Sequence, residues 1–446
     1  CGAPNLETGQ KIAFAKEGAL LYNHRSGGKE ALKSTKIRGV PSSGMICSEK
    51  ELGLSDDHSG ILVLPDTAET GTPLVEEFGD FIFDADITPN RPDCLSIIGI
   101  AREIAAITGK TIAEPPSTHL EVGPHIAEKV NVHVEDADLC PRYTAGLLSG
   151  LTIGPSPKWL STNLEKAGIR SINNVVDVTN YVMLEYGQPM HAFDFDTLNG
   201  KTVFVRKAVE GEQLAALDEQ TYELRSPMLV IADSKGPVGL AGIIGGVNSG
   251  VTEKTSSVLL ESANFNHTNT YLTRTKTGIT TDASYRFERG IRPELAPIAL
   301  RRAISLILNI CGGEASEGMI DVYPGQGAPE TIDFNLSRVK QILGIELDRV
   351  TLDQLLVSLG FGIEEKNDDG KIVLTAPYWR TDIAIEDDVV EEIARISGYD
   401  SIPTTMISTP IPHHSPKPLR ELRESVRDTL AGLGMQEVIS YPITNL

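Results

Sequence analysis

The pattern of hydrophobic and polar residues changes twice along the chain. Over the first part, apolar residues form short runs separated by glycines, which is typical of short strands joined by turns. Such runs occur at residues 11–15, 19–22, 35–40 and 60–64. We therefore expect residues 1–78 to form a small β-barrel that lacks its first strands.

Residues 80–325 form the largest block and mix helical with strand-like spacing. Apolar residues at helical spacing predict helices at residues 95–108, 157–167, 173–185, 266–275 and 293–311. Apolar or alternating runs predict strands at residues 131–135, 143–151, 202–207, 229–232, 238–244 and 257–261. The mixture favours an α+β fold with a largely antiparallel sheet.

Residues 331–406 are compact and acidic, and they predict a small, largely helical α+β domain. The expected elements are helices at residues 337–343, 351–359 and 386–397 and a strand at residues 371–376. A further amphipathic helix is expected from residue 416 to 434, and it would open another domain. The fold class is therefore multidomain α+β.

Net charge limits how the chain can contact nucleic acid. Its 446 residues include 40 Lys and Arg against 61 Asp and Glu, a net charge of −21. A protein steered to nucleic acid by its overall field is usually basic, so a contact here needs a local patch or a partner chain. The length suits about three domains. No apolar run approaches the roughly 18 residues of a membrane span, so no membrane partner is expected.

Cysteine use indicates a reducing compartment. The five cysteines are widely spaced and include no Cys-x-x-Cys pair, which argues against a disulfide framework and against a zinc site. They are Cys1, Cys47, Cys94, Cys140 and Cys311. Because the chain begins without Met and stops in a strand-like run, we expect a fragment of a longer protein.

Four carboxylates near the last acidic helix form the first candidate site. Asp388, Glu391 and Glu392 are spaced i, i+3, i+4 and share one helical face, and Asp382 lies just upstream. Clustered carboxylates repel one another unless a cation lies among them, and oxygen ligands without His or Cys favour Mg²⁺. The alternative is an acidic first turn that opposes the helix dipole, which suits residues 386–387.

A second candidate site combines scattered polar residues with a glycine-rich run. Asn180 is polar in an apolar helix, His191 follows a Gln-Pro turn, and residues 239–246 are rich in glycine. Such glycines let a ligand approach the backbone closely, although the run is not a phosphate-binding motif. Glu261 ends a strand, either facing water or accepting a hydrogen bond inside a pocket. A lone histidine is more often structural than catalytic.

Several long stretches carry a family resemblance. They include ITPNRPDCLS at residues 87–96, QPMHAFD at 188–194 and WRTDI at 379–383, and further matches at residues 36–40, 43–53, 174–180 and 285–290. Together these stretches resemble the β subunits of bacterial phenylalanine–tRNA ligase along essentially the whole chain. Ordered matches of this length are far more specific than any single motif.

The resemblance implies a domain order. Residues 1–78 are similar to part of a tRNA-binding domain of the oligonucleotide-binding (OB) fold, and residues 80–325 to the B3/B4 region, which in this family hydrolyses mischarged tyrosyl-tRNA. Residues 331–406 resemble the B5 domain. Residues 416–446 resemble the start of a catalytic-like domain, which then breaks off.

The resemblance also implies partners and site residues. In the family, ATP and phenylalanine bind the α subunit of a cytoplasmic α2β2 enzyme, and tRNA is the other partner. The family's Mg²⁺ site, shared with the α subunit, matches Asp382, Asp388, Glu391 and Glu392. The editing site matches His191, Asn180 and Glu261 as catalytic residues, and Thr179, Ala241, Gly242 and Ala263 as substrate-binding residues.

Two other functions stay open at this point. The chain could be a free-standing editing hydrolase, which a native mass without a second subunit would support. It could instead be a non-catalytic scaffold that binds tRNA, which a failure to deacylate tyrosyl-tRNA would support. A Glu261 side chain that accepts a hydrogen bond from the tyrosyl hydroxyl would favour the editing subunit, since phenylalanine lacks that group.

Overall fold

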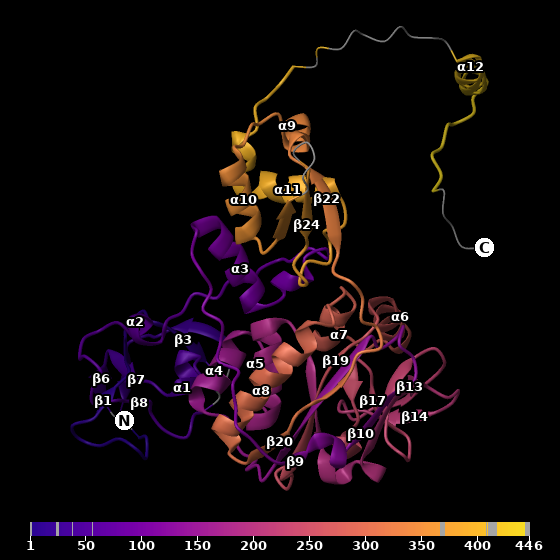
Figure 1. The fold of residues 1–446 in the computed structure, drawn as a ribbon. Helices are drawn as coiled ribbons and strands as arrows, with labels where there is room; N and C mark the ends of the chain where they lie inside the picture. Colours follow the sequence, from indigo (N-terminus) through magenta and orange to yellow (C-terminus); the bar gives the residue numbers. More distant parts are fainter. Residues whose placement is uncertain are drawn as a thin grey trace. The chain divides into compact units, whose positions relative to one another are not determined.

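Two units make up the computed structural model, which describes residues 2–23, 26–37, 39–55, 57–365, 371–406, 408 and 417–441. The first unit contains Cys1–Asp86 and Ser161–Ser171, and the second contains Ile87–Leu160 and Ile172–Leu446. Figure 1 follows the chain through both. Cys1, residue 38 of a matching stretch, and residues 416 and 442–446 of the expected last domain lie outside the described residues.

Short antiparallel strand pairs build the first unit, as the glycine-punctuated pattern predicts. The pairs are β1 (Lys11–Ile12) with β8 (Val63–Leu64), β2 (Phe14–Lys16) with β7 (Gly44–Ile46), β3 (Leu20–Asn23) with β4 (Gly28–Ala31), and β5 (Thr35–Ile37) with β6 (Val40–Ser42). The predicted single strand at residues 35–40 is a hairpin, because Gly39 has a φ of 84° and turns the chain. Helices α1 (Glu49–Leu52) and α2 (Leu74–Phe78) complete these elements.

Two sheets form the larger part of the second unit. The six-stranded sheet contains β12 (Met190–Asp194), β19 (Ser257–Asn264), β11 (Arg142–Ser149), β20 (Glu314–Glu317) and β9 (Glu121–His125) in that order, and β21 (Ile320–Val322) also pairs with β11. The five-stranded sheet contains β10 (Asn131–Val134), β13 (Thr202–Lys207), β16 (Leu229–Ala232), β17 (Pro237–Leu240) and β18 (Ile244–Gly245). Only the β10–β13 and β20–β9 pairs of these two sheets are parallel, so the expectation of a largely antiparallel fold is confirmed.

One hydrophobic core of the second unit lies between these sheets. Tyr143 and Phe193 from the first sheet pack in one cluster with Val203 and Ile231 from the second. Helices α5 (Asn174–Tyr186) and α8 (Leu295–Cys311) cover the other face of the six-stranded sheet. A Cβ atom added to Gly146 of β11 would lie 2.6 Å from Cδ1 of Ile304 on α8, so a larger residue there would force that side chain to move.

The remaining elements of this part are helices and one hairpin. They are α3 (Ile97–Thr108), α6 (His267–Thr277), α7 (Asp282–Phe287) and the hairpin of β14 (Gln213–Ala215) and β15 (Thr221–Glu223). Helix α4 (Lys158–Lys166) begins in the second unit and continues into the first. The predicted strand at residues 238–244 is divided into β17 and β18, because Gly242 has a φ of 69° and forms a turn. The short strand β12 was not predicted, since its five residues show no clear alternation.

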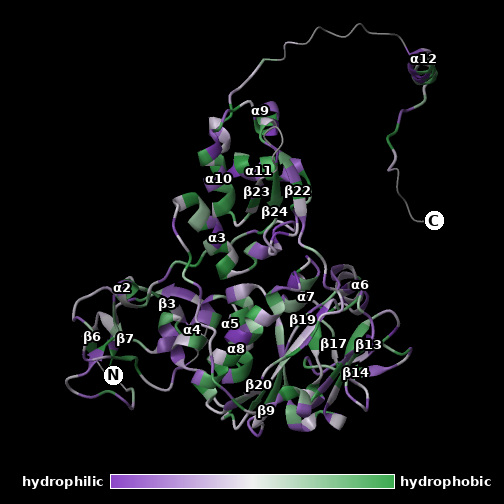
Figure 2. Ribbon diagram, viewed as in Figure 1, coloured by the Kyte–Doolittle hydropathy of each residue, from purple (hydrophilic) through white to green (hydrophobic). Residues whose placement is uncertain are grey.

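A three-stranded sheet and three helices are described in residues 331–406, which we call the acidic module. The strand order is β22 (Thr331–Asn335), β24 (Lys371–Thr375), β23 (Gly362–Glu365), and the helices are α9 (Ser337–Leu343), α10 (Arg349–Ser358) and α11 (Glu386–Ser397). Figure 2 shows hydrophobic and hydrophilic residues along both α10 and α11, as expected of helices with one buried face. Strands β22 and β23 were missed because β22 contains two strongly apolar residues and β23 contains one, too few to mark a strand. Helix α12 (Pro418–Gly432) follows.

None of the helices in the described part of the chain combines the length and apolar character needed to cross a bilayer.

A buried ion pair joins α8 to α5 and gives the first prediction. Arg302 donates to both carboxylate oxygens of Glu185 at 2.8 and 3.0 Å, and both residues are less than 10% exposed. Glu185→Ala leaves the guanidinium buried without its carboxylate, and we expect a loss of about 3–5 kcal/mol in the free energy of unfolding. Urea denaturation measures it. The control is Glu223→Ala, which breaks an exposed pair with Arg225 and should cost at most about 1 kcal/mol. Equal losses would contradict the prediction.

Candidate functional site

A cavity opens where β12 and β19 meet the turn between β17 and β18. It holds about 450 Å³ of empty space, part of which is open to solvent. Its walls are mostly apolar: Phe265 and Phe287 contribute rings, and the glycine-rich turn contributes backbone. Among the lining residues, the titratable ones are His191 and Glu261. An apolar cavity with few polar groups is the usual form of a small-ligand site.

Strand register places the two polar side chains on one face. His191 of β12 lies directly opposite Glu261 of β19 in the antiparallel ladder, and Ala145 of β11 lies opposite Glu261 on its other side. Residues opposite one another in such a ladder point to the same face of the sheet. Tyr143 is two residues before Ala145 on β11, so its side chain projects to that face as well.

Glu261 is buried and hydrogen-bonded. Its side chain is 7% exposed, and Oε2 accepts a hydrogen bond of 2.7 Å from the hydroxyl of the fully buried Tyr143. Burial raises the pKa of Glu261 to about 7, and the hydrogen bond from Tyr143 opposes that rise because it favours the charged form. Near neutral pH the group is therefore present both as an acid and as a carboxylate.

His191 is held as a neutral imidazole. Burial lowers its pKa to about 4, and its Nε2 atom is buried without a hydrogen-bond partner among the described residues. The ring packs edge-on against Phe193, with centroids 4.4 Å apart. A Cβ added to Gly245 would lie 2.3 Å from the ring, so a larger residue there would push the imidazole out of this position. A ligand in the cavity would give Nε2 the partner that it lacks.

Four of the expected editing residues line this cavity. His191, Glu261, Ala241 and Gly242 all belong to its wall, although they lie on three separate segments of the chain. Gly242 adopts a φ of 69°, and a Cβ there would lie 3.0 Å from Phe287 and 3.1 Å from Phe265. The turn therefore approaches the aromatic wall as closely as its backbone allows.

The other three expected residues lie outside the lining. The hydroxyl of Thr179 donates within α5 to the carbonyl of Val176 at 2.7 Å. Asn180 is half-buried on the same helix. Ala263 belongs to the core between the sheets, and its carbonyl accepts a hydrogen bond from Gln188 at 2.8 Å. Their roles at the site stay predictions.

Sequence reasoning missed the aromatic residues of the site. Tyr143 was predicted only as part of a strand, although a phenol at the start of that strand was the signal that could have drawn notice. Phe287 belongs to the matching stretch at residues 285–290, and it lines the cavity. The neighbouring Arg286 instead donates to the carbonyl of Asp282 at 3.0 Å and of Leu95 at 3.2 Å.

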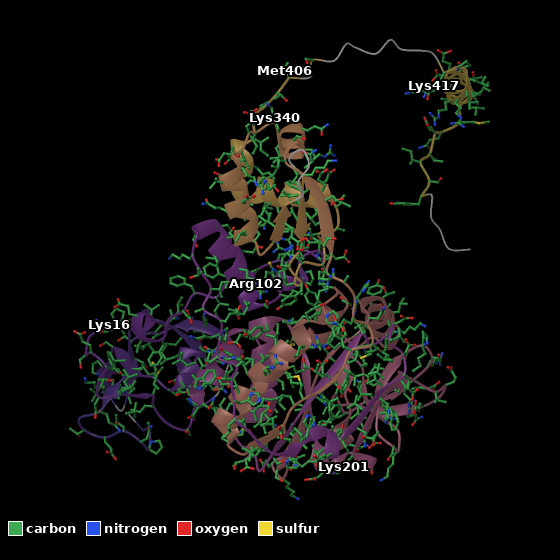
Figure 3. All side chains as sticks on the ribbon, viewed as in Figure 1. Lys16, Arg102, Lys201, Lys340, Met406 and Lys417 are labelled. Atoms are coloured by element: carbon green, nitrogen blue, oxygen red, sulfur yellow. The ribbon has the colours of Figure 1, made fainter. Side chains whose placement is uncertain are left out.

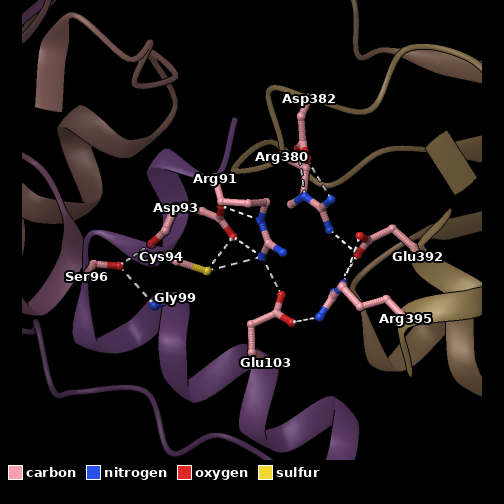
Figure 4. Close-up of polar contacts among 10 residues, drawn as sticks. All are labelled: Arg91, Asp93, Cys94, Ser96, Gly99, Glu103, Arg380, Asp382, Glu392 and Arg395. Atoms are coloured by element: carbon pink, nitrogen blue, oxygen red, sulfur yellow. Dashed lines mark hydrogen bonds and ion pairs between the residues drawn. The ribbon is translucent and has the colours of Figure 1, made fainter. Parts of the chain in front are cut away.

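Arginine side chains bind two of the four carboxylates that are expected to hold magnesium. Arg380 donates to both oxygens of Asp382 at 2.8 and 2.9 Å and also to Glu392 (Figure 4). Arg395 donates to both oxygens of Glu392 at 2.7 and 3.1 Å. Burial by itself raises the pKa of Glu392, but the hydrogen bonds and charges of the two arginines outweigh burial and lower the pKa to about 2. Glu392 is therefore ionised, and the positive charges of Arg380 and Arg395 balance its negative charge.

The other two carboxylates do not complete a metal site in this arrangement. Asp388 accepts hydrogen bonds from the backbone of Ala384 and Ile385 at 2.8 and 2.9 Å, and Glu391 is exposed. In the described part of the chain, the acidic and sulfur ligands that do gather are those of Asp93, Cys94 and Glu103, and an arginine donates to all three. As placed here, the expected residues do not fit a magnesium ion.

One of these arginines, Arg395, also ties the acidic module to α3. Arg395 donates to Glu103 of α3 at 2.5 Å, and Arg91 donates to the other oxygen of Glu103 (Figure 4). Arg102 of α3, labelled in Figure 3, lies with its guanidinium 3.8 Å from the ring centroid of Trp379. The carboxylates of α11 therefore have a structural use that needs no cation.

The low pKa of His191 gives a direct test of its surroundings. We expect its ring protons to titrate at about pH 4 in NMR spectra, because burial disfavours the imidazolium. His191→Gln identifies the signal by removing it. A midpoint for this signal near the ordinary histidine value of about 6.5 would contradict the enclosed site.

Four models of known protein families match the chain. The "B3/4 domain" model matches residues 139–312, and the "tRNA synthetase B5 domain" model matches residues 332–399. A "tRNA binding domain" model matches residues 1–73, and the "Phenylalanyl tRNA synthetase beta chain CLM domain" model matches residues 402–446. The cavity therefore lies within the B3/4 match.

Curated relatives agree with these matches. The phenylalanine–tRNA ligase β subunit of Dehalococcoides mccartyi is 43% identical over 100% of this chain and 56% of its own length. That of Geobacter sulfurreducens is 45% identical over 99% of this chain and 55% of its own length.

A solved N-terminal fragment of the phenylalanyl-tRNA synthetase β subunit from Pyrococcus horikoshii is 19% identical, over 70% of this chain and 85% of the fragment, with a TM-score of 0.37. At that score the similarity carries no argument about the fold. The chain spans about half the length of the curated relatives it matches, and it belongs to the family of phenylalanine–tRNA ligase β subunits.

Proposed function

We propose that this chain supplies the editing site of a phenylalanine–tRNA ligase and hydrolyses tyrosyl-tRNA there. The observation that carries the proposal is the buried Glu261 carboxyl at the wall of an apolar cavity, directly opposite His191. The B3/4 match over the same residues and the names of the curated relatives support it.

The chemistry of the two amino acids explains why such a site is needed. Phenylalanine and tyrosine differ by one hydroxyl, and a hydrophobic synthetic pocket rejects an added hydroxyl only weakly. In the cavity, the tyrosyl ring would pack against Phe265 and Phe287, and its hydroxyl would donate to Glu261. A phenylalanyl group would leave Glu261 without that partner, at a cost of about 1–3 kcal/mol.

Hydrolysis then needs a water molecule placed beside the ester. The unpartnered Nε2 of the neutral His191 can accept a hydrogen bond from that water or from the terminal ribose. A pKa of about 4 makes this imidazole a weak base, so its proposed role is to orient rather than to remove a proton. Asn180, Thr179 and Ala263 stay predicted contacts of the substrate.

The rest of the enzyme is proposed from the family. An α subunit would bind ATP and phenylalanine, and two copies of each subunit would form an α2β2 enzyme. Residues 1–73, which match a tRNA-binding model, would contact the tRNA. The cytoplasm is the proposed compartment, and the four described cysteines, which are all free and buried, are consistent with it.

Magnesium binding at the B5 carboxylates stays a prediction. It requires Arg380 and Arg395 to leave Asp382 and Glu392. If the ion binds in the complete enzyme, Asp388→Asn should lower the magnesium content measured by mass spectrometry of the purified protein. Asp387→Asn is the control, because Asp387 pairs with Arg338 at 2.9 Å. Equal magnesium content in both variants would contradict the prediction.

Glu261→Ala tests the editing proposal most directly. Loss of a hydrogen bond to a charged acceptor costs about 1.5–3 kcal/mol, so the ratio of tyrosyl- to phenylalanyl-tRNA deacylation should fall roughly 10- to 150-fold. The two rates are measured side by side with the complete enzyme. His191→Ala should slow both reactions and leave their ratio in place.

The control is Glu212→Ala, which removes a carboxylate that pairs with Arg206 at 2.6 Å in the same B3/4 match. It should leave both rates as they are. A Glu261→Ala enzyme with an unchanged ratio would refute the pocket assignment. Failure of the unaltered enzyme to deacylate tyrosyl-tRNA would favour a non-catalytic scaffold.

A further inference from the structure

We propose that Tyr143 is a specificity-determining positioning residue: its hydroxyl binds one carboxylate oxygen of Glu261 and leaves the other to receive the hydroxyl of a tyrosyl group. This inference rests on the proposed function and adds a residue to it. Tyr143 does not line the cavity, so it would act on the substrate through Glu261.

The geometry supports a fixed carboxylate. Tyr143 is 0% exposed, its hydroxyl lies 2.7 Å from Oε2 of Glu261, and the two residues belong to adjacent strands, β11 and β19. A short hydrogen bond between two buried side chains on paired strands leaves little freedom for rotation. The carboxylate plane, and with it the direction of the remaining oxygen, is therefore set by the protein before a substrate arrives.

The hydrogen bond from Tyr143 to Glu261 has the same chemistry as the contact proposed for the substrate. Tyr143 presents a phenol to Glu261, and a tyrosyl group would present a second phenol to the same carboxylate. A carboxylate has two oxygens and accepts several hydrogen bonds, so the two phenols are compatible. Glu261 would then be satisfied on both oxygens by tyrosine and on one oxygen by phenylalanine.

The groups around Glu261 leave it free to titrate alone. From β11 and the residues before it come Tyr143 and Cys140, whose pKa values are both raised well above the ordinary range, chiefly by burial. From β12 comes His191, which is neutral above about pH 4. The turn at residues 239–245 and helix α7 line the cavity with apolar residues and glycine. Glu261 is therefore the lining group that changes charge near pH 7.

Removal of the Tyr143 hydroxyl has a directional consequence. The hydrogen bond favours the carboxylate, so its loss raises the pKa of Glu261 further above about 7. A neutral carboxylic acid is a weaker acceptor for a phenol than a carboxylate is. Discrimination for tyrosyl-tRNA should therefore rise with pH in the unaltered enzyme, and Tyr143→Phe should move that rise to higher pH.

The test is a pH profile of selectivity in the complete enzyme. The ratio of tyrosyl- to phenylalanyl-tRNA deacylation is measured from about pH 5.5 to 9. We expect a midpoint near pH 7 for the unaltered enzyme and a shift of about one to two pH units upward for Tyr143→Phe. Glu261→Gln, which cannot ionise, should give a flat profile.

Tyr222→Phe is the matched control, because it removes a hydroxyl that donates to the exposed Asp218 at 2.6 Å. Its profile should match that of the unaltered enzyme. A merely structural role for Tyr143 would lower both deacylation rates and leave the midpoint in place. An unshifted midpoint in Tyr143→Phe would overturn the inference.

Fluorinated tyrosine at position 143 keeps the test decisive if Tyr143→Phe does not fold. Fluorine makes the phenol a stronger donor without removing it, so the midpoint should move to lower pH as fluorines are added. An unmoved midpoint would overturn the inference. If Glu261→Ala keeps its selectivity, the proposed function itself fails; if Glu261→Ala loses it while the Tyr143 variants behave as the unaltered enzyme, only this inference fails.

Discussion

The antiparallel register of β12, β19 and β11 is the constraint on which the site depends. It places His191 opposite Glu261 and directs Tyr143 to the same face. The second sheet then buries this face, and α5 and α8 bury the other. A slip of one residue in either pair would turn these side chains away from the cavity, so the chemistry of the site is a consequence of strand pairing.

Burial shifts the pKa values of Glu261 and His191 in opposite directions. It raises the pKa of Glu261 to about 7 and lowers that of His191 to about 4, because an enclosed apolar site disfavours charge on both. The result is a histidine that stays neutral and a carboxyl that is poised between two states. A group of that kind is suited to recognise a hydroxyl, while a neutral imidazole is suited to orient a water molecule.

Charge is handled differently in the acidic module. Asp382 and Glu392 are held by Arg380 and Arg395, so their negative charge is neutralised by side chains of the same module. Arg395 also binds Glu103 of α3 and thereby joins the module to the preceding part of the chain. Carboxylates at metal-like spacing on a helix are compatible with either use, and the position of the arginines decides which use is realised.

Much of the architecture was determined by local sequence. Patterns at residues 202–207, 229–232, 337–343 and 386–397 predicted elements with the observed bounds, because alternation and helical spacing depend on neighbours alone. The family motifs also identified Glu261 and His191. Tyr143 and Glu261 are far apart in sequence, so only tertiary packing could decide that they pair. The arginines and carboxylates of the B5 region are close in sequence, but their spacing suits an ion pair as well as a cation site, so the side-chain directions and burial set by packing decided between them.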